Sequence, residues 1–129
     1  MKYVYPVIFK EDEGKIGVEV PDIPNCFTFG DNLADAMDMA KDAIEMMLVE
    51  YENDNKQIPE PSKIADIKTD GIVSLIKADT LEWRKEFDNK AIKKTLSIPA
   101  WLNSQAEKAM VNFSQVLQEA LLQKLNISD

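Results

Sequence analysis

The sequence of 129 residues contains no histidine and only one cysteine, Cys26. Histidine is the side chain that most often acts as a general base or a metal ligand near neutral pH, so its absence argues against a catalytic triad or a zinc site. A lone cysteine cannot form an internal disulfide, and we expect Cys26 to be a small buried apolar residue. The sequence therefore predicts a protein without a metal or another cofactor.

Long apolar runs are also missing from the sequence. No stretch approaches the roughly 20 consecutive apolar residues of a membrane-spanning helix. Residues 2–6 lack the apolar core and the cleavage site of a signal peptide. We therefore expect a cytoplasmic protein with no membrane partner, built as one globular domain with a small appendage.

Charge is unevenly distributed along the chain. Residues 1–62 carry 14 acidic and 5 basic side chains, a net charge of −9, whereas residues 63–90 are neutral overall and residues 91–129 have a net charge of +1. An acidic body repels nucleic-acid phosphates, so this body suits a cationic binding partner. The alternative is that the acidic residues serve only solubility, and charge alone does not decide between the two.

The first part of the chain has the pattern of a small sheet. Pro6 cannot donate a backbone hydrogen bond, so we expect an edge or a bulge at Pro6 in the first strand. The first two strands are joined by a turn at residues 11–14, in which Gly14 can take a positive φ. Short runs of β-branched and aromatic residues predict four strands in all, at residues 1–9, 15–20, 26–29 and 71–78.

One long helix is predicted after the third strand, with Asn32 as its N-cap and Asp35 completing a variant of the capping box. The helix ends before the polar, proline-containing residues 53–62. Its opposite face is expected to be either a solvated surface or a partner-binding surface, and it carries Asp35, Asp38, Asp42 and Glu45. The face expected to meet the sheet has apolar residues at spacings of three and four, namely Leu33, Ala36, Met37, Ala40, Ile44, Met47, Leu48 and Tyr51.

The last third of the chain reads as one short strand followed by two short helices. Roughly 40 residues cannot bury enough apolar surface alone, so we expect two copies to pair their strands into a two-stranded ribbon. Pro99 ends the strand, the first helix begins near Ala100, and Asn112 is expected to cap the second helix with Gln115. Because strand side chains alternate, residues 92–98 present two faces, one with Ile92, Leu96 and Ile98, the other with Lys93, Thr95 and Ser97.

Several short motifs occur in an order that resembles the HicB antitoxin family. They are residues 5–9, the acidic hairpin turn, residues 20–28, residues 30–31, the long helix and residues 58–62. The resemblance covers essentially the whole chain. It departs at Asn25, where the family often has glycine, but asparagine tolerates a positive φ better than most residues. The resemblance implies a body with a partial ribonuclease H-like fold, and a partner toxin, HicA, that is small, basic and RNA-cutting.

Ribonuclease H activity needs several carboxylates that converge on two metal ions. The acidic residues nearest the predicted strands lie in or beside turns, and they are Glu11, Asp12, Glu13, Glu19 and Asp22. The strands and the helix show no convergent set of carboxylates. We therefore expect no enzymatic activity.

The whole stretch from residues 93–99 through residues 112–117 resembles a ribbon-helix-helix domain, whose two-stranded ribbon enters the major groove of DNA. On that resemblance, the candidate base-reading residues are Lys93, Thr95 and Ser97. Lys94 lies on the inward face, from which its ammonium can reach the DNA backbone. The candidate phosphate-binding amides are at the start of the second helix, at Asn112, Phe113 and Ser114. The alternative is a dimerisation module that does not touch DNA.

Together these patterns predict an α+β protein with a toxin-neutralising domain at residues 1–80, a linker at 81–90 and a ribbon-helix-helix domain at 91–129. The charged residues 79–90 are expected to form either a short helix or an ordered linker. The resemblance implies an antitoxin that occludes a HicA-like toxin and represses its own operon by binding operator DNA, as a homodimer or a tetramer. The residues expected to contact the toxin, in place of RNA phosphates, are Glu11, Asp12, Glu13 and Asp22. The alternatives are a stand-alone repressor whose body senses a small ligand and, less favoured, an enzyme.

Overall fold

The structure is a computed structural model that describes residues 1–127. It divides into two compact units, the first spanning Met1–Lys90 and the second beginning at Ala91. Residues 81–90, which the sequence indicated as either a short helix or an ordered linker, fall within the first unit. Most of them belong to a helix, α2 (Thr80–Phe87), which packs against the long helix of that unit.

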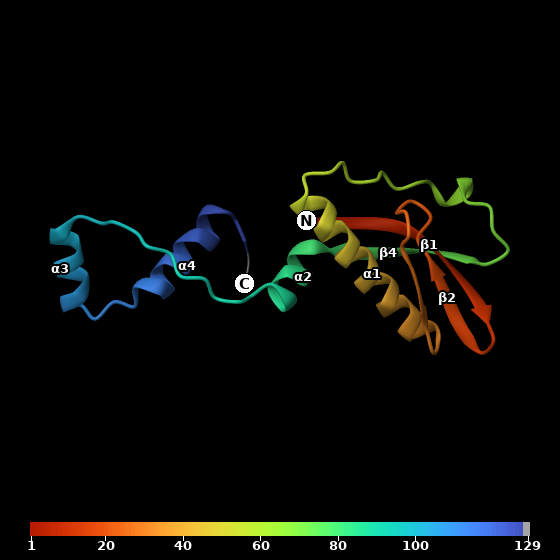
Figure 1. Cartoon of the computed structure of the whole chain (residues 1–129), viewed down its shortest axis with the longest axis horizontal. Coiled ribbons are helices and arrows are strands. Elements are labelled where there is room, and N and C mark those ends of the chain that lie inside the picture. The colour runs from red at the N-terminus through yellow and green to blue at the C-terminus, as the bar shows by residue number, and fades with distance from the viewer. Residues whose placement is uncertain (128–129) are drawn as a thin grey trace. The chain divides into compact units, whose positions relative to one another are not determined.

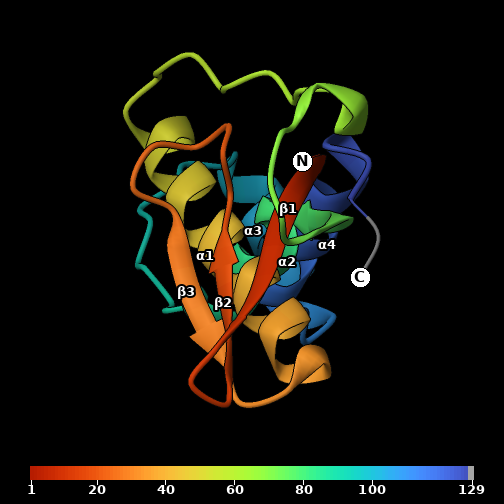
Figure 2. The same cartoon turned by 90° about the vertical axis from the view of Figure 1, so that its right-hand side faces the viewer.

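The first unit is built on one four-stranded antiparallel sheet in the order β3–β2–β1–β4 (Figures 1 and 2). The four predicted strands are confirmed. The first extends further into the hairpin than predicted, because residues 11 and 12 still pair with residues 16 and 15. The strands are β1 (Lys2–Asp12), β2 (Lys15–Glu19), β3 (Phe27–Gly30) and β4 (Ile72–Asp79).

The turn between β1 and β2 contains only two residues. Glu13 has a φ of 50° and Gly14 a φ of 81°, and two successive positive φ values define the type I′ turn that suits a two-residue hairpin. The positive φ expected at Gly14 is confirmed, as is the one at Asn25, whose φ is 60°. Glu13 also takes the left-handed conformation, which its side chain makes less favourable than it is for glycine.

Pro6 lies where β1 has a strand neighbour on one side only, because β2 pairs with β1 only from Ile8 onward. The Thr80 N–H donates to the Met1 carbonyl at 3.0 Å. This bond shows which opposite residues of β1 and β4 form hydrogen-bonded pairs. Every second residue of β1 from Met1 then exchanges hydrogen bonds with β4. Pro6 falls between those positions, so its nitrogen points away from β4 and no ladder bond is lost. The edge expected at Pro6 is confirmed.

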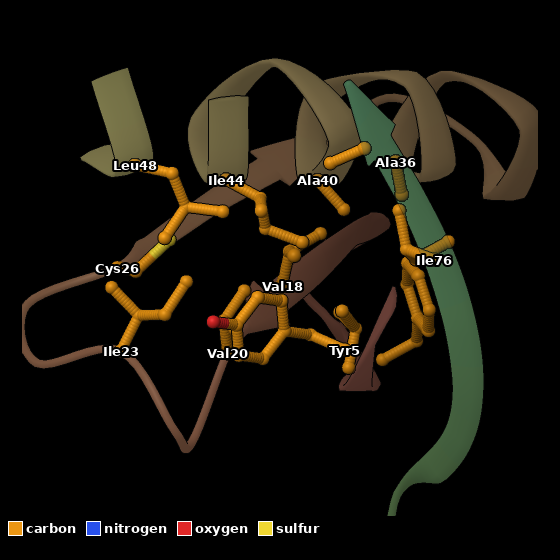
Figure 3. Packing of buried hydrophobic residues seen from close by; sticks show 13 residues of the cluster. Tyr5, Val18, Val20, Ile23, Cys26, Ala36, Ala40, Ile44, Leu48 and Ile76 are labelled. Carbon is orange, nitrogen blue, oxygen red and sulfur yellow. The ribbon is translucent and has the colours of Figure 1, made fainter. Parts of the chain in front are cut away.

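The long helix α1 spans Leu33–Asn53 and begins at the predicted cap. The side chain of Asn32 accepts a hydrogen bond from the Asp35 N–H at 2.9 Å, and the Asp35 carboxylate accepts one from the Asp31 N–H at 2.8 Å. α1 packs on one face of the sheet (Figure 3). Side chains from α1, the sheet and the β2–β3 connection form one buried core, which includes Tyr5, Val7, Val18, Val20, Ile23, Cys26, Ala36, Ala40, Ile44, Leu48 and Ile76.

Most of the apolar face predicted for α1 is buried or half-buried, but its first turn differs. Leu33 and Met37 are 51% and 39% exposed. The prediction that Glu45 lies on the outer face is wrong, because Glu45 is only 2% exposed. The reason is α2, which covers that side of α1 and which the helical periodicity of α1 alone does not reveal. The Glu45 carboxylate accepts hydrogen bonds from the ammonium of Lys41 at 3.1 Å and from the Asp79 N–H at 2.8 Å.

The second unit contains the two predicted helices, α3 (Ala100–Lys108) and α4 (Phe113–Lys124). The cap of α4 is confirmed, since the Asn112 side chain accepts from the Gln115 N–H at 3.1 Å. The strand expected at residues 92–98 is not formed in the single chain. A strand exists only beside a hydrogen-bonded neighbour, and the prediction placed that neighbour in a second copy. None of residues 91–127 is buried.

Candidate functional site

The hairpin tip brings together three of the carboxylates predicted to contact the toxin. Glu11 and Asp12 end β1, Glu13 occupies the turn, and all three are exposed. Because side chains alternate along a strand, Glu11 is on the α1 side of the sheet and Asp12 on the other. These three residues, here called the hairpin acids, therefore flank the tip from both sides.

The face of the sheet turned away from α1, here called the open face, continues from the hairpin acids. The strand register places Asp12, Glu19, Phe27, Phe29 and Leu75 on it. Phe27 is 71% exposed and Phe29 is 57% exposed, which is unusual for large aromatic side chains. A depression of about 530 Å³ crosses this region, lined by Ile8, Lys10, Glu11, Asp12, Gly17, Val18, Glu19, Thr28 and Thr69.

Two lysines of the open face are ion-paired with aspartates outside the hairpin. Lys10 lies 2.9 Å from Asp70, and their hydrogen bond raises the pKa of Lys10 and lowers that of Asp70. Lys15 lies 3.2 Å from Asp31, and its ammonium is 4.9 Å from the centre of the Phe29 ring. The hairpin end therefore combines carboxylates with exposed aromatic surface, a combination that suits a cationic protein partner.

Asp22, the fourth predicted contact, is not brought to the hairpin acids. It lies in the β2–β3 connection, at the opposite end of β2 from the turn (Figure 2). Its carboxylate accepts hydrogen bonds from the Ser62 N–H at 2.9 Å and from the Ser62 hydroxyl. The Tyr5 hydroxyl donates to the Pro59 carbonyl nearby. Asp22 thus links the segment after α1, through Ser62, to the β2–β3 connection, and these hydrogen bonds favour a structural role for Asp22.

A polar cluster that the sequence analysis missed surrounds Glu52 near the end of α1. Its carboxylate accepts hydrogen bonds from the hydroxyls of Tyr3 at 2.8 Å and Thr80 at 2.9 Å, and from the guanidinium of Arg84 at 3.1 Å. Burial, followed by the bond to Glu52, raises the pKa of Tyr3 to about 12. These contacts join β1, α1 and α2. No local sequence signal identifies them, because the partners are 28 to 49 residues apart.

The candidate DNA-contacting residues all lie in the second unit and none of them is buried. Asn112 uses its side chain as the cap of α4, so only its backbone and the next two amides, at Phe113 and Ser114, face outward from the helix start. The remaining candidates lie in the segment before α3, which has no helix or strand, and they are Lys93, Lys94, Thr95 and Ser97.

Within residues 1–127, no cluster of three or more Cys, Asp or Glu side chains is arranged so that it could hold a metal ion. None of the helices in that range is both long and apolar enough to cross a membrane.

Comparison with known proteins identifies the family. The family model of the HicB-like antitoxins of bacterial toxin–antitoxin systems matches residues 5–125. Antitoxin HicB 2 of Photorhabdus laumondii subsp. laumondii is 43% identical over 58 residues, which are 45% of this chain and 42% of that protein. The chain thus spans less than half the length of that relative. An uncharacterized 14.9 kDa protein of Haemophilus phage HP1 is 30% identical over 77% of this chain and 75% of its own length.

Solved structures share the fold over nearly the whole chain. A toxin–antitoxin complex from Streptococcus pneumoniae superposes with a TM-score of 0.61 and 24% identity, covering 96% of this chain and 99% of the other. The Burkholderia pseudomallei antitoxin HicB superposes with a TM-score of 0.55 and 22% identity, covering 95% and 98%. The match of the family model to both units decides the assignment: the chain belongs to the HicB-like antitoxins of bacterial toxin–antitoxin systems.

Proposed function

We propose that the chain is an antitoxin that binds a small basic HicA-like toxin through its first unit and operator DNA through its second. The observation that carries this proposal is the family match over residues 5–125, which includes both units. On the resemblance seen in the sequence, the first unit is a partial ribonuclease H-like fold and the second a ribbon-helix-helix fold. Neutralisation by occlusion needs no catalytic group in the antitoxin.

The hairpin acids and the open face are the part of the first unit best suited to the toxin. A basic surface that binds RNA phosphates is also attracted to carboxylates, and the exposed rings of Phe27 and Phe29 offer apolar contact beside them. Residues 1–62 have a net charge of −9, which accelerates encounter with a cationic protein. The antitoxin would thus occupy the surface of the toxin to which RNA would otherwise bind.

The second unit is suited to pairing with another copy and then to DNA. Its apolar side chains are exposed in the single chain, including Ile92 at 85%, Trp101 at 69% and Leu125 at 63%. Pairing of two copies through residues 92–98 would cover such side chains and place Lys93, Thr95 and Ser97 on the outer face of the ribbon. Repression of the operon would follow from binding of that ribbon in the major groove.

The toxin-binding half is tested by reversing the three hairpin acids together, as Glu11→Lys, Asp12→Lys and Glu13→Lys. We expect the affinity for the HicA-like toxin to fall by about 2 kcal/mol or more, roughly thirtyfold, with loss of neutralisation in cells. The matched control makes the same change in charge on the exposed face of α1, as Asp38→Lys, Asp42→Lys and Glu50→Lys, and should keep most of the affinity.

Equal losses in the two triple variants would mean that only net charge matters and would contradict docking at the hairpin. A chain that binds no basic toxin at low salt, and whose deletion is not toxic, would favour the stand-alone repressor instead. Metal-dependent RNA cleavage by the purified chain would favour an enzyme.

A further inference from the structure

The strand β4 forms an edge of the sheet, and this edge is long and apolar. β4 has eight residues and, within the described part of the chain, pairs with β1 alone. Ile72 is 67% exposed and Leu75 is 53% exposed. Proteins normally protect such an edge with charges, prolines or a covering segment, because unpaired backbone groups are a template for another strand. Lys77 is the one charged residue inside β4 before its last position.

The alternation of hydrogen-bonded pairs between β1 and β4 shows which backbone groups of β4 point away from β1. Because the Thr80 N–H bonds to the Met1 carbonyl, the amides of residues 74, 76 and 78 point to β1 and those of residues 73, 75, 77 and 79 point away. The outward amide of Asp79 is taken by the buried carboxylate of Glu45, at 2.8 Å. The outward groups from Val73 to Lys77 have no such cover among the described residues.

We propose that the β4 edges of two copies pair antiparallel about a twofold axis at Ser74, so that one continuous sheet runs through both first units. The sequence of this strand is close to a palindrome in its apolar pattern, because residues 72–76 read Ile-Val-Ser-Leu-Ile. About Ser74, Val73 lies opposite Leu75 of the other copy and Ile72 lies opposite Ile76. Each exposed apolar side chain of the edge therefore gains an apolar neighbour across the axis.

The positions of the charged residues are also compatible with a second copy of the chain pairing at this edge. In the pairing about Ser74, Lys77 lies opposite Gly71 of the other copy, so no like charges face each other directly. A twofold interface requires that one patch complement itself, and this strand meets that requirement without any other segment. β4 is at the opposite edge from β3, so the pairing leaves Phe27 and Phe29 accessible. The inference does not depend on the proposed toxin or DNA binding.

Cross-linking of the full chain tests the register directly. Ser74→Cys would place two thiols on the axis in a non-hydrogen-bonded pair, where the Cα atoms lie about 4.5 Å apart, within reach of a disulfide. The native Cys26 will not interfere, because it is 3% exposed and burial raises its pKa to about 11. We expect a mild oxidant to give at least about ten times more covalent dimer with Ser74→Cys than with the control Lys77→Cys, whose two copies would be roughly 20 Å apart.

A second measurement does not rely on an engineered thiol. Light scattering of the full chain carrying Leu75→Lys should give half the mass of the unmodified chain, because the substitution brings charges together beside the axis. The control Phe27→Lys, on the opposite edge of the same sheet, should keep the mass. Equal cross-linking of Ser74→Cys and Lys77→Cys, or an unchanged mass for Leu75→Lys, would overturn the proposal. A Leu75→Lys chain that keeps its mass but no longer binds the toxin would overturn it too, and assign the edge to the toxin.

Discussion

At the scale of single residues, Glu52 is a partly buried carboxylate that accepts hydrogen bonds from three side chains. Burial by itself raises the pKa of this carboxyl, but hydrogen bonds from Tyr3, Thr80 and Arg84 outweigh burial and lower it below its ordinary value of 4.5. The ionised form is therefore the one that the folded chain favours. Since the donors come from β1 and α2, this carboxylate stabilises the packing of α2 on the body.

The pH dependence of stability should report this cluster. A folded-state pKa below the unfolded value contributes stability that is present above the unfolded pKa, 4.5, and is lost as pH falls through the lowered folded pKa. Glu52→Gln should lower the free energy of unfolding by about 1–3 kcal/mol at pH 7. When the pH falls below the ordinary carboxyl pKa of 4.5, the free energy of unfolding should decrease less for Glu52→Gln than for the unmodified chain. Urea unfolding at neutral and acidic pH measures both effects.

The control is Glu50→Gln, an exposed position on the same helix, which should change stability by no more than about 0.5 kcal/mol. If Glu52→Gln behaved like this control at pH 7, the cluster would not stabilise the fold.

At the scale of elements, the features that the sequence predicted are those with local causes. Asn32 and Asn112 cap their helices because a short side-chain oxygen reaches an amide three residues on. Gly14 marks the hairpin because it takes a positive φ at no steric cost. The four strands follow from alternation and turn residues in the same stretch of chain. The hairpin acids are gathered by this local geometry as well.

The features that the sequence did not predict depend on distant parts of the chain. Glu45 is buried by α2, which follows it by more than 30 residues. Asp22 is engaged by Ser62, 40 residues away. The strand at residues 92–98 requires a partner strand, so alternation in one chain predicts its faces but does not by itself form it. The open face with Phe27 and Phe29 follows from sheet register, which local patterns leave undetermined.

The segment before α3 yields a prediction about DNA. Lys93→Ala or Thr95→Ala should weaken operator binding by about 1–3 kcal/mol, roughly 5- to 150-fold, because each would lose a contact to a base edge. Neutralisation of the toxin should be unchanged. Titration of labelled operator DNA at fixed salt measures the first effect, and growth on co-expression with the toxin measures the second.

Lys108→Ala is the matched control for Lys93→Ala, because it removes the same charge from the same unit at the end of α3. Equal weakening by the two lysine variants would mean that only charge matters. If Lys93→Ala or Thr95→Ala also abolished toxin neutralisation, the assignment of toxin binding to the first unit and DNA binding to the second would be contradicted.

At the scale of the whole molecule, the two units differ in charge and in packing. Residues 1–90 have a net charge of −9 and contain the buried core, whereas residues 91–129 have a net charge of +1 and residues 91–127 bury no side chain. The first unit is therefore equipped to fold by itself. The first compact unit extends to Lys90, because α2 packs on α1 through the Glu52 cluster.

Comparing the chain that ends at Lys90 with the full chain, for binding of the HicA-like toxin and of operator DNA, tests whether the two units have separate functions. We expect the shortened chain to bind the toxin with an affinity within about threefold of the full chain, a difference under roughly 1 kcal/mol, and not to bind the operator. Loss of toxin binding by a folded shortened chain, or retention of operator binding, would show that the functions are not divided between the units in this way.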